Sequence, residues 1–345
     1  MNESKEHIHG LPMWHDSDLE RKRLLYKGTF GDLYVVVHVP SKQLYVQKLY
    51  YSWKRLNHME CEAKCFSLFP PHKNIVRAVA CCVHDGKKDG GKREAYASII
   101  LEYVDGPDLF DFLVVADTSS EAGQSVVDKQ FPVQWSLLQQ ELIECKAKRH
   151  DTAVRYLRGV CEALAHLHRH GIVHGDIKPE NIVVGTDGCV RLIDLDMASF
   201  NGHPINDQKT GLGTPEFMPP EHIHAFLTND KPCATSGADM WSFGILAAEL
   251  LLGTTFFHDS RGHQNSSPHA MEQAWMRMNE SAAVRAHLAE KMKCQNDIDP
   301  HLSSMCLGLL RYKANQRLSA KACLQHDFFA AKAPENKETL TIQCY

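Results

Sequence analysis

The stretch 174–181 reads His-Gly-Asp-Ile-Lys-Pro-Glu-Asn and combines three chemically useful side chains. The carboxylate of Asp176 can accept a proton from a hydroxyl group, as a general base does. The side-chain oxygen of Asn181 can bind Mg²⁺, and the ammonium of Lys178 can neutralise charge on a group that moves. A further carboxylate, Asp194, comes directly after a strand-like run, where it could hold a metal ion. A carboxylate, an amide oxygen and an ammonium this close together in the sequence are groups that acid–base and metal-dependent chemistry can use.

The same stretch resembles the catalytic loop of the protein-kinase family, in which an Asp and an Asn stand at fixed spacing. The resemblance implies that Asp176 is the catalytic base, that Lys178 assists transfer and that Asn181 binds a metal ion. Residues 194–196, Asp-Leu-Asp, are similar to the family's Asp-Phe-Gly element, which implies that Asp194 binds Mg²⁺. A Lys two positions after the catalytic Asp resembles the serine/threonine branch. The implied reaction is ATP-dependent phosphorylation of a protein Ser or Thr, with Mg²⁺ or with Mn²⁺ in its place.

Residues 26–33, Tyr-Lys-Gly-Thr-Phe-Gly-Asp-Leu, resemble the family's glycine-rich loop. Gly28 and Gly31 would let backbone N–H groups approach the phosphates of ATP, because no Cβ stands in the way. Lys48 lies in the third strand and is similar to the catalytic lysine that pairs with the α- and β-phosphates.

Lys48 then needs a carboxylate on the helix that follows, and both Glu60 and Glu62 are candidates. The family's pattern, with one extra residue allowed at Pro70-Pro71, favours Glu62. Phe66 then falls one turn later on the same helix face, where the family places an apolar packing residue. The other glutamate would be an ordinary surface charge.

The resemblance also implies which residues surround the adenine of ATP. Two faces of apolar side chains would sandwich the ring, a gatekeeper would stand behind it, and two linker backbones would pair with its edge. The residues are Leu33, Val46 and Val183 for the sandwich, Leu101 as gatekeeper, and Glu102 and Val104 for the linker. Each of the apolar residues could equally be ordinary core.

Later segments favour a protein kinase over a small-molecule kinase. Residues 213–217 resemble the loop that receives the substrate residue after the target hydroxyl amino acid, and 219–221, Pro-Pro-Glu, resemble Ala-Pro-Glu. Asp239 would brace the backbone of the catalytic loop, and Arg317 would pair with Glu221. The resemblance covers about residues 20–330 in the correct order, which is more specific than any single motif.

Four positions depart from the family pattern: Tyr26 for Gly, Gly175 for Arg, Leu195-Asp196 for Phe-Gly, and Pro219 for Ala. None removes a residue assigned to phosphate binding, to metal binding or to the catalytic base, so the sequence favours an active but divergent kinase. The alternative is a pseudokinase that acts as an ATP-binding or partner-binding scaffold.

The Arg that Gly175 replaces normally pairs with a phosphate on the activation loop and orders that loop. The hypothesis is that the segment from Ser199 to Thr214 is ordered without phosphorylation, or by a bound partner. Ser199 and Thr210 are the hydroxyls to test, and Lys209 could substitute for the missing cation.

The elements that must position these residues can be read from the patterning. Residues 22–50 alternate as a hairpin and a third strand, 53–69 predict a helix that Pro70-Pro71 ends, and 75–84 and 95–102 predict strands. Residues 151–170 predict a helix, and short strands follow near 172, 182–183 and 190–193. The predicted class is α+β, a bilobal protein-kinase fold with a β-rich N-lobe and an α-rich C-lobe. The predicted bounds are a tail (1–20), the N-lobe (21–104), the C-lobe (105–330) with a surface insertion (about 116–149), and a second tail (331–345).

The 345 residues carry a net charge of −4 and are 43% hydrophobic, which suits a globular protein large enough for two cores. The sequence has no excess of basic residues that would indicate a nucleic-acid partner, and no run of eighteen apolar residues that would indicate a membrane span. The polar N-terminus does not resemble a secretory signal, so the twelve Cys are expected as reduced thiols. We therefore expect a cytoplasmic protein, with the nucleus also open, whose partners are a protein substrate and a possible regulatory protein.

Overall fold

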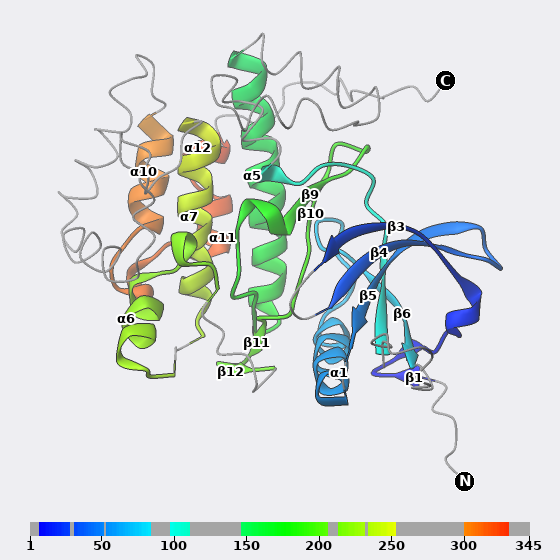
Figure 1. Cartoon of the computed structure of the whole chain (residues 1–345). Coiled ribbons are helices and arrows are strands. Elements are labelled where there is room, and N and C mark those ends of the chain that lie inside the picture. Colours follow the sequence, from blue (N-terminus) through cyan, green and yellow to red (C-terminus); the bar gives the residue numbers. More distant parts are fainter. Residues whose placement is uncertain are drawn as a thin grey trace.

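The computed structural model describes residues 7–27, 31–51, 53–83, 97–110, 146–205, 213–231, 234–252 and 300–330. Within them the chain has a β-rich N-terminal half and a helical C-terminal half (Figure 1). Gly28, the greater part of the predicted insertion, Thr210 and the tail 331–345 lie outside the described residues.

The N-terminal half is built on one antiparallel sheet with the strand order β3-β4-β5-β7-β6. Helix α1 packs against the same apolar core as this sheet, through Met59 and Ala63. On β5, alternation places Val46 and Tyr50 in that core and Lys48 beside α1, because every second side chain shares a face. The elements are β3 (Leu19–Lys27), β4 (Asp32–His38), β5 (Gln43–Tyr50), α1 (Trp53–Ser67), β6 (Ala78–Val83) and β7 (Ala97–Glu102).

The C-terminal half packs its helices around α5 and α7, whose apolar residues share the largest core cluster. Helix α5 begins five residues earlier than the predicted start at 151. No helix within the described ranges combines the length and apolar character needed to cross a bilayer. The helices are α5 (Lys146–Arg169), α6 (Pro220–Thr228), α7 (Ser236–Leu252), α10 (Pro300–Leu309), α11 (Ala320–Leu324) and α12 (Asp327–Ala330). The short strands are β8 (Ile172–Val173), β9 (Ile182–Val184), β10 (Val190–Leu192), β11 (Ser199–Phe200) and β12 (His203–Pro204).

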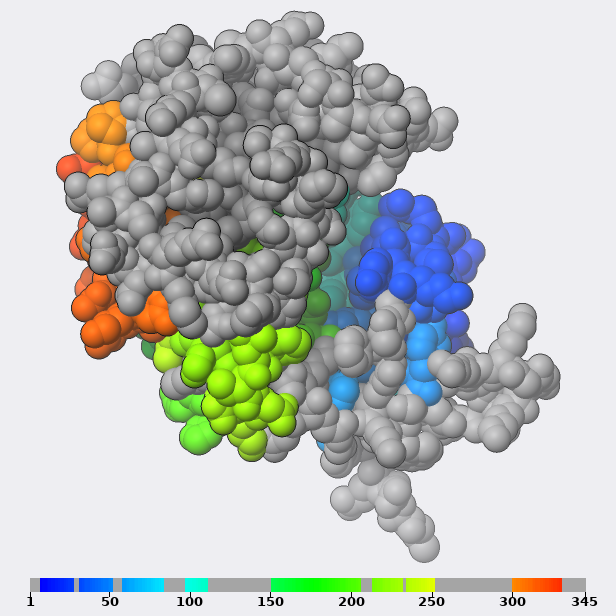
Figure 2. Space-filling model, turned by 60° about the vertical axis from the view of Figure 1, so that its left-hand side comes forward, coloured from blue at the N-terminus to red at the C-terminus, as the bar shows by residue number. Residues whose placement is uncertain are grey.

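The two halves have separate cores that meet at a few contacts. Phe66, on α1, packs against both core clusters. The backbone N–H of Val76 donates to the carbonyl of Leu192 at 2.9 Å, and the N–H of Leu192 donates to the carbonyl of Asn74 at 2.9 Å. Figure 2 shows the sheet residues of the N-terminal half, in blue, on one side of the molecule and α6, in yellow-green, on the other. The hydrogen bonds that Leu192 makes with Val76 and Asn74 tie strand β10, which leads to Asp194, to the segment that follows α1.

Residues before β3 form part of the N-terminal half, a contact that the sequence pattern did not reveal. The strands β1 (His7–Ile8) and β2 (Leu11–Pro12) pair with each other, and Ile8 is buried in the core that contains Met59. The ring of Trp14 stacks on His38 with centroids 3.9 Å apart, and the N–H of Trp14 donates to the carbonyl of Cys81 at 2.9 Å. These residues therefore lie over both α1 and the outer strand β6.

We expect Ile8→Ala to lower the free energy of unfolding by about 2 kcal/mol, because it removes buried methyl groups from a small core. Denaturant unfolding measures the change. His7→Ala, on the exposed neighbour in the same strand, is the control and should have little effect. Equal stability of Ile8→Ala and the unmodified chain would mean that β1 adds nothing to the N-terminal core.

Candidate active site

The catalytic loop, residues 174–181, lies between β8 and β9 and is held from below by Asp239 at the start of α7. One carboxylate oxygen of Asp239 accepts the N–H of His174 at 2.8 Å, and the other accepts the N–H of Gly175 at 2.9 Å. The Nε2 of His168 lies 2.8 Å from the first of these oxygens. Burial alone would raise the pKa of Asp239, but the hydrogen bond and charge of His168 and the nearby donors lower it below its usual value. The predicted bracing of the loop by Asp239 is thus present as a buried, ionised anchor.

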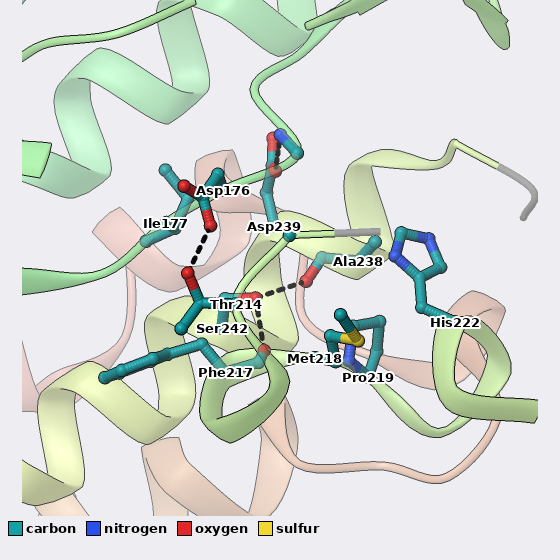
Figure 3. Close-up of a pocket in the computed structure, with 12 residues that line it drawn as sticks. Asp176, Ile177, Thr214, Phe217, Met218, Pro219, His222, Ala238, Asp239 and Ser242 are labelled. Atoms are coloured by element: carbon teal, nitrogen blue, oxygen red, sulfur yellow. Dashed lines mark hydrogen bonds between the residues drawn. The ribbon is translucent and has the colours of Figure 1, made fainter. Parts of the chain in front are cut away.

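Three side chains meet around the carboxylate of Asp176. The Nζ of Lys178 lies 2.9 Å from its Oδ2, the hydroxyl of Thr214 donates to its Oδ1 at 2.8 Å, and the Nδ2 of Asn181 donates to its Oδ2 at 3.0 Å. Lys178 also donates to the hydroxyl of Thr214 at 2.9 Å. Figure 3 shows Thr214 directed at Asp176 from the opposite segment of the chain. The arrangement fixes both carboxylate oxygens of Asp176.

Sequence reasoning placed Thr214 only in the substrate-binding loop and missed its contact with Asp176. The motif that surrounds Thr214 gave its segment but could not give its hydrogen bonds. A hollow of about 10 Å³, about the space of one water molecule, lies beside this contact. Phe217 and Met218 of the loop and Ala238 of α7 are among its lining residues (Figure 3). The hydroxyl of Ser242 donates to the carbonyl of Phe217 at 2.6 Å and so ties this loop to α7.

A second cluster surrounds Lys48, whose ammonium contacts carboxylates from two other segments. Glu62, rather than Glu60, reaches it from α1, with its Oε2 3.0 Å from Nζ. The oxygens of Asp194 and Asp196, which follow β10, lie 2.9 Å and 3.2 Å from Nζ. Asp194 has the left-handed backbone angle φ of +62°, which is uncommon outside glycine. The Lys48 ammonium therefore lies where the sheet, α1 and the segment after β10 converge.

The Lys48 cluster contains three carboxylates for one ammonium. Burial alone would lower the pKa of Lys48, but Asp194, Asp196 and Glu62 together raise it well above its usual value. Burial also raises the pKa of Glu62 to about 7, because Lys48 offsets only part of that effect and Asp196 adds to it. The side chain of Glu62 is only 1% exposed, so of the three carboxylates it loses the most contact with water.

Of the residues predicted to surround adenine, Leu33, Val46 and Leu101 lie on β4, β5 and β7, and Val183 lies on β9 in the C-terminal half. Val46 stands opposite Leu101 on β7, and Leu33 stands opposite Lys48. Leu33, Val46 and Val183 are half-buried, whereas Leu101 is buried. The N–H of Glu102 donates to the carbonyl of Arg77 at 2.9 Å, and Val104 follows in the linker. Their contacts with a nucleotide stay a prediction, as does that of Gly28.

Gly31 is required for a close approach between two strands. A Cβ on Gly31 would lie 1.7 Å from the carbonyl oxygen of Leu49, a distance that no side chain can accept. The carboxylate of the next residue, Asp32, accepts the hydroxyl of Tyr51 at 2.6 Å. The start of β4 is therefore fixed to the end of β5, directly after the predicted phosphate-binding loop.

Gly175, in place of the family's Arg, lies against the segment that follows Asp194. It has a φ of +83°, and a Cβ there would lie 2.6 Å from the carbonyl oxygen of Met197. A Cβ on Gly213 would lie 2.7 Å from the carbonyl oxygen of Gly175. Ser199 is buried in β11, so its hydroxyl is not an accessible phosphorylation site in this conformation. Loop ordering without phosphorylation stays a hypothesis, because Lys209 and Thr210 lie outside the described residues.

The predicted pair of Glu221 and Arg317 anchors the segment after Thr214. The two nitrogens NH1 and NH2 of Arg317 each donate to one oxygen of Glu221 at 2.6 Å. The guanidinium also donates to the carbonyls of Arg311, Gly237 and Tyr312. Each nitrogen of this buried guanidinium donates hydrogen bonds, so the pair fixes α6 to the segment that carries Arg317.

Comparison with known proteins gives a consistent assignment. A sequence model described as protein kinase domain matches residues 19–329. The chain is similar to an Aurora kinase of Schizosaccharomyces pombe, with 28% identity over 190 residues, 55% of this chain and 46% of that kinase. It is similar to Aurora/IPL1-related protein kinase 2 of Caenorhabditis elegans, with 27% identity over 244 residues, 69% of this chain and 64% of that kinase. It is also similar to serine/threonine-protein kinase MRCK gamma of Mus musculus, with 27% identity over 247 residues, 70% of this chain and 13% of that protein. The matched region spans less than two thirds of each of these relatives.

We expect Gly175→Ala to destabilise the fold, because a Cβ at this left-handed residue would press on the carbonyl of Met197. Gly188→Ala is the matched control, since Gly188 has a similar φ of +72° but no atom within 4 Å of an added Cβ. The control should lose about 1–2 kcal/mol of unfolding free energy from the backbone angle alone. The Gly175 variant should lose at least about 1 kcal/mol more. Equal losses in denaturant unfolding would show that the contact with Met197 is soft.

Proposed function

The chain belongs to the protein kinase family, and we propose that it is an active serine/threonine kinase that transfers the γ-phosphate of ATP to a protein hydroxyl. The observation that carries this proposal is the hydrogen-bonded cluster in which Lys178, Thr214 and Asn181 all contact the carboxylate of Asp176. A carboxylate held at both oxygens is oriented in advance of the reaction, which is how a general base gains its effect. The same cluster supports the role of Lys178 as a catalytic side chain.

In the proposed reaction, the substrate hydroxyl lies against Asp176 and its oxygen attacks the γ-phosphorus of ATP. A bond forms between this oxygen and phosphorus, the bond between the γ-phosphorus and the bridging oxygen of ADP breaks, and the hydroxyl proton passes to Asp176. Lys178 is close enough to Asp176 to neutralise charge on the phosphoryl group during transfer. Thr214 and Asn181 keep the carboxylate in place while the proton moves.

Lys48 and its acidic neighbours are suited to bind ATP together with a divalent cation. Oxygen atoms of Glu62, Asp194 and Asp196 lie within 4.8 Å of one another, and within the described residues the ammonium of Lys48 is the cation that contacts all three. Carboxylate and amide oxygens are the ligands that Mg²⁺ prefers, and Mn²⁺ accepts the same donors. Within the described residues, Asn181 uses only its Nδ2 in hydrogen bonds, which leaves its Oδ1 for a cation. Asp194 and Asn181 would hold the metal ion, which when bound neutralises phosphate charge.

The runner-up function is a pseudokinase scaffold, and phosphate transfer separates the two readings. The departures at Tyr26, Gly175 and Asp196 leave Lys48 and Asp176 in place, which favours activity. A nucleotide-binding assay cannot decide, because a scaffold can also bind ATP. We propose a protein substrate and a possible regulatory protein as partners, in keeping with relatives that are named as protein kinases.

We expect Asp176→Asn to lower phosphate transfer from labelled ATP to a generic protein by about 10²–10⁴-fold, because the base is lost. Nucleotide binding should change little, since Asp176 faces the acceptor in the proposed reaction. Asp187→Asn is the control, because Asp187 pairs with Arg191 in a turn away from the cluster. Near-normal transfer by Asp176→Asn would refute its assignment as the base, and no transfer by the unmodified chain would favour the scaffold.

We expect Asp194→Asn to weaken Mg²⁺-dependent ATP binding at least about tenfold, because it removes a formal charge from the metal site. Asp196→Asn should have a smaller effect, because we assign it no bond to the metal. Titration calorimetry with ATP at several Mg²⁺ concentrations measures both variants. A larger loss in the Asp196 variant would mean that Asp196, and not Asp194, is the principal metal ligand.

A further inference from the structure

Tyr50 lies two residues after Lys48 on the same face of β5 and touches both members of the Lys48–Glu62 pair. Its ring is 1% exposed and packs in the core with Met59 and Ala63 of α1. Its hydroxyl donates to Oε2 of Glu62 in a short hydrogen bond. The Nζ of Lys48 lies 6.0 Å from the centroid of the ring, within the range of a cation–π contact.

Charge explains why Glu62 needs this second donor. Lys48 contacts Glu62 at 3.0 Å, but it also contacts Asp194 and Asp196, so its three N–H groups are divided among the carboxylates. Asp194 is 40% exposed and can be solvated by water, whereas the side chain of Glu62 is 1% exposed. A buried carboxylate with too few donors is costly, since it loses water without replacement. Asp196 increases this shortage, because its position in the family pattern is a glycine without any charge.

We propose that Tyr50 is a positioning residue for phosphate transfer, whose hydroxyl holds Glu62 in place for Lys48 because Asp196 competes for the same ammonium. The proposal rests on the proposed kinase function, and it concerns how that function is kept in a chain that carries an additional carboxylate. Tyr50 touches no substrate, so it acts through Glu62 and Lys48.

The environment keeps the Tyr50 hydroxyl in its donor form. Burial and the adjacent charge of Glu62 raise the pKa of Tyr50 well above its usual value, so the hydroxyl stays protonated. A neutral donor can stabilise Glu62 without drawing on Lys48, which remains free for its other partners.

The neighbouring Tyr51 provides a natural control. Because side chains alternate along a strand, Tyr51 points away from the Lys48 cluster, and its hydroxyl donates to Asp32 at 2.6 Å. Tyr50→Phe and Tyr51→Phe therefore remove the same hydroxyl, each from a carboxylate partner, at adjacent positions. Only the first change affects the carboxylate that pairs with Lys48.

The test is a double-mutant cycle between Tyr50→Phe and Asp196→Asn on the full chain, with Tyr51→Phe combined in the same way. Each protein is assayed for kcat and KM with Mg-ATP, for Mg-ATP affinity by calorimetry, and for melting temperature. Tyr50→Phe should lower kcat/KM for ATP about tenfold or more, as expected for the loss of a hydrogen bond to a charged group. With Asp196→Asn present, the same change should cost threefold or less, since Lys48 is then shared with fewer charges.

A loss that is equal in both Asp196 backgrounds, or no loss at all, would overturn the proposal, as would equal coupling for Tyr51→Phe. If Tyr50→Phe folds poorly, its melting temperature should recover in the Asp196→Asn background, and failure to recover also counts against the proposal. If the unmodified chain binds Mg-ATP but transfers no phosphate, the kinase function is refuted. The coupling between Tyr50→Phe and Asp196→Asn is then measured through the affinity for Mg-ATP. An unmodified chain that binds no nucleotide would overturn both.

Discussion

The carboxylate of Asp239 is the fixed point on which the C-terminal side of the site depends. It is buried on α7, and it accepts the N–H groups of His174 and Gly175 together with a contact from His168. Backbone groups in a loop need hydrogen-bond partners, and here one ionised side chain supplies two of them from the buried helix α7. Asp239 of α7 therefore holds in place the loop that carries Asp176. The pair of Glu221 and Arg317 extends the same principle, because it fixes the segment that brings Thr214 to Asp176.

The N-terminal side of the site is organised by a different constraint, an excess of negative charge. Lys48 contacts Glu62, Asp194 and Asp196, and the single positive charge of one ammonium cannot neutralise three carboxylates. Such an arrangement is stable only where other groups also stabilise the carboxylates. Tyr50 does so for the buried Glu62, and water can do so for the exposed Asp194. The remaining charge is what gives this region an attraction for cations, and it links the architecture of α1 and β5 to nucleotide binding.

Sequence reasoning identified the site where residue type and spacing are fixed by chemistry. Lys48, Glu62, Asp239 and Arg317 could be found because their partners lie at recognisable positions, and the structure brings each pair together. The contact of Tyr50 with Glu62 could not be found from the sequence, because a tyrosine in a predicted strand indicates only that its ring packs in the core. The packing of Ile8 and Trp14 was missed for a related reason, because isolated apolar residues in a polar segment have no periodicity to show which surface they cover. Burial of Ser199 depends on its pairing with β8, a long-range contact that local sequence does not encode.

The close approach of Gly175 to Met197 has a consequence for how this chain can change over time. An arginine at 175 would bring not only a charge but also a Cβ, which meets the carbonyl of Met197 at 2.6 Å. The backbone at 197 would have to move before that substitution could be tolerated. A one-step return to the family's arginine is thus blocked by neighbours rather than by the site itself. The glycine is therefore entrenched, because an arginine at this position requires a compensating change around Met197.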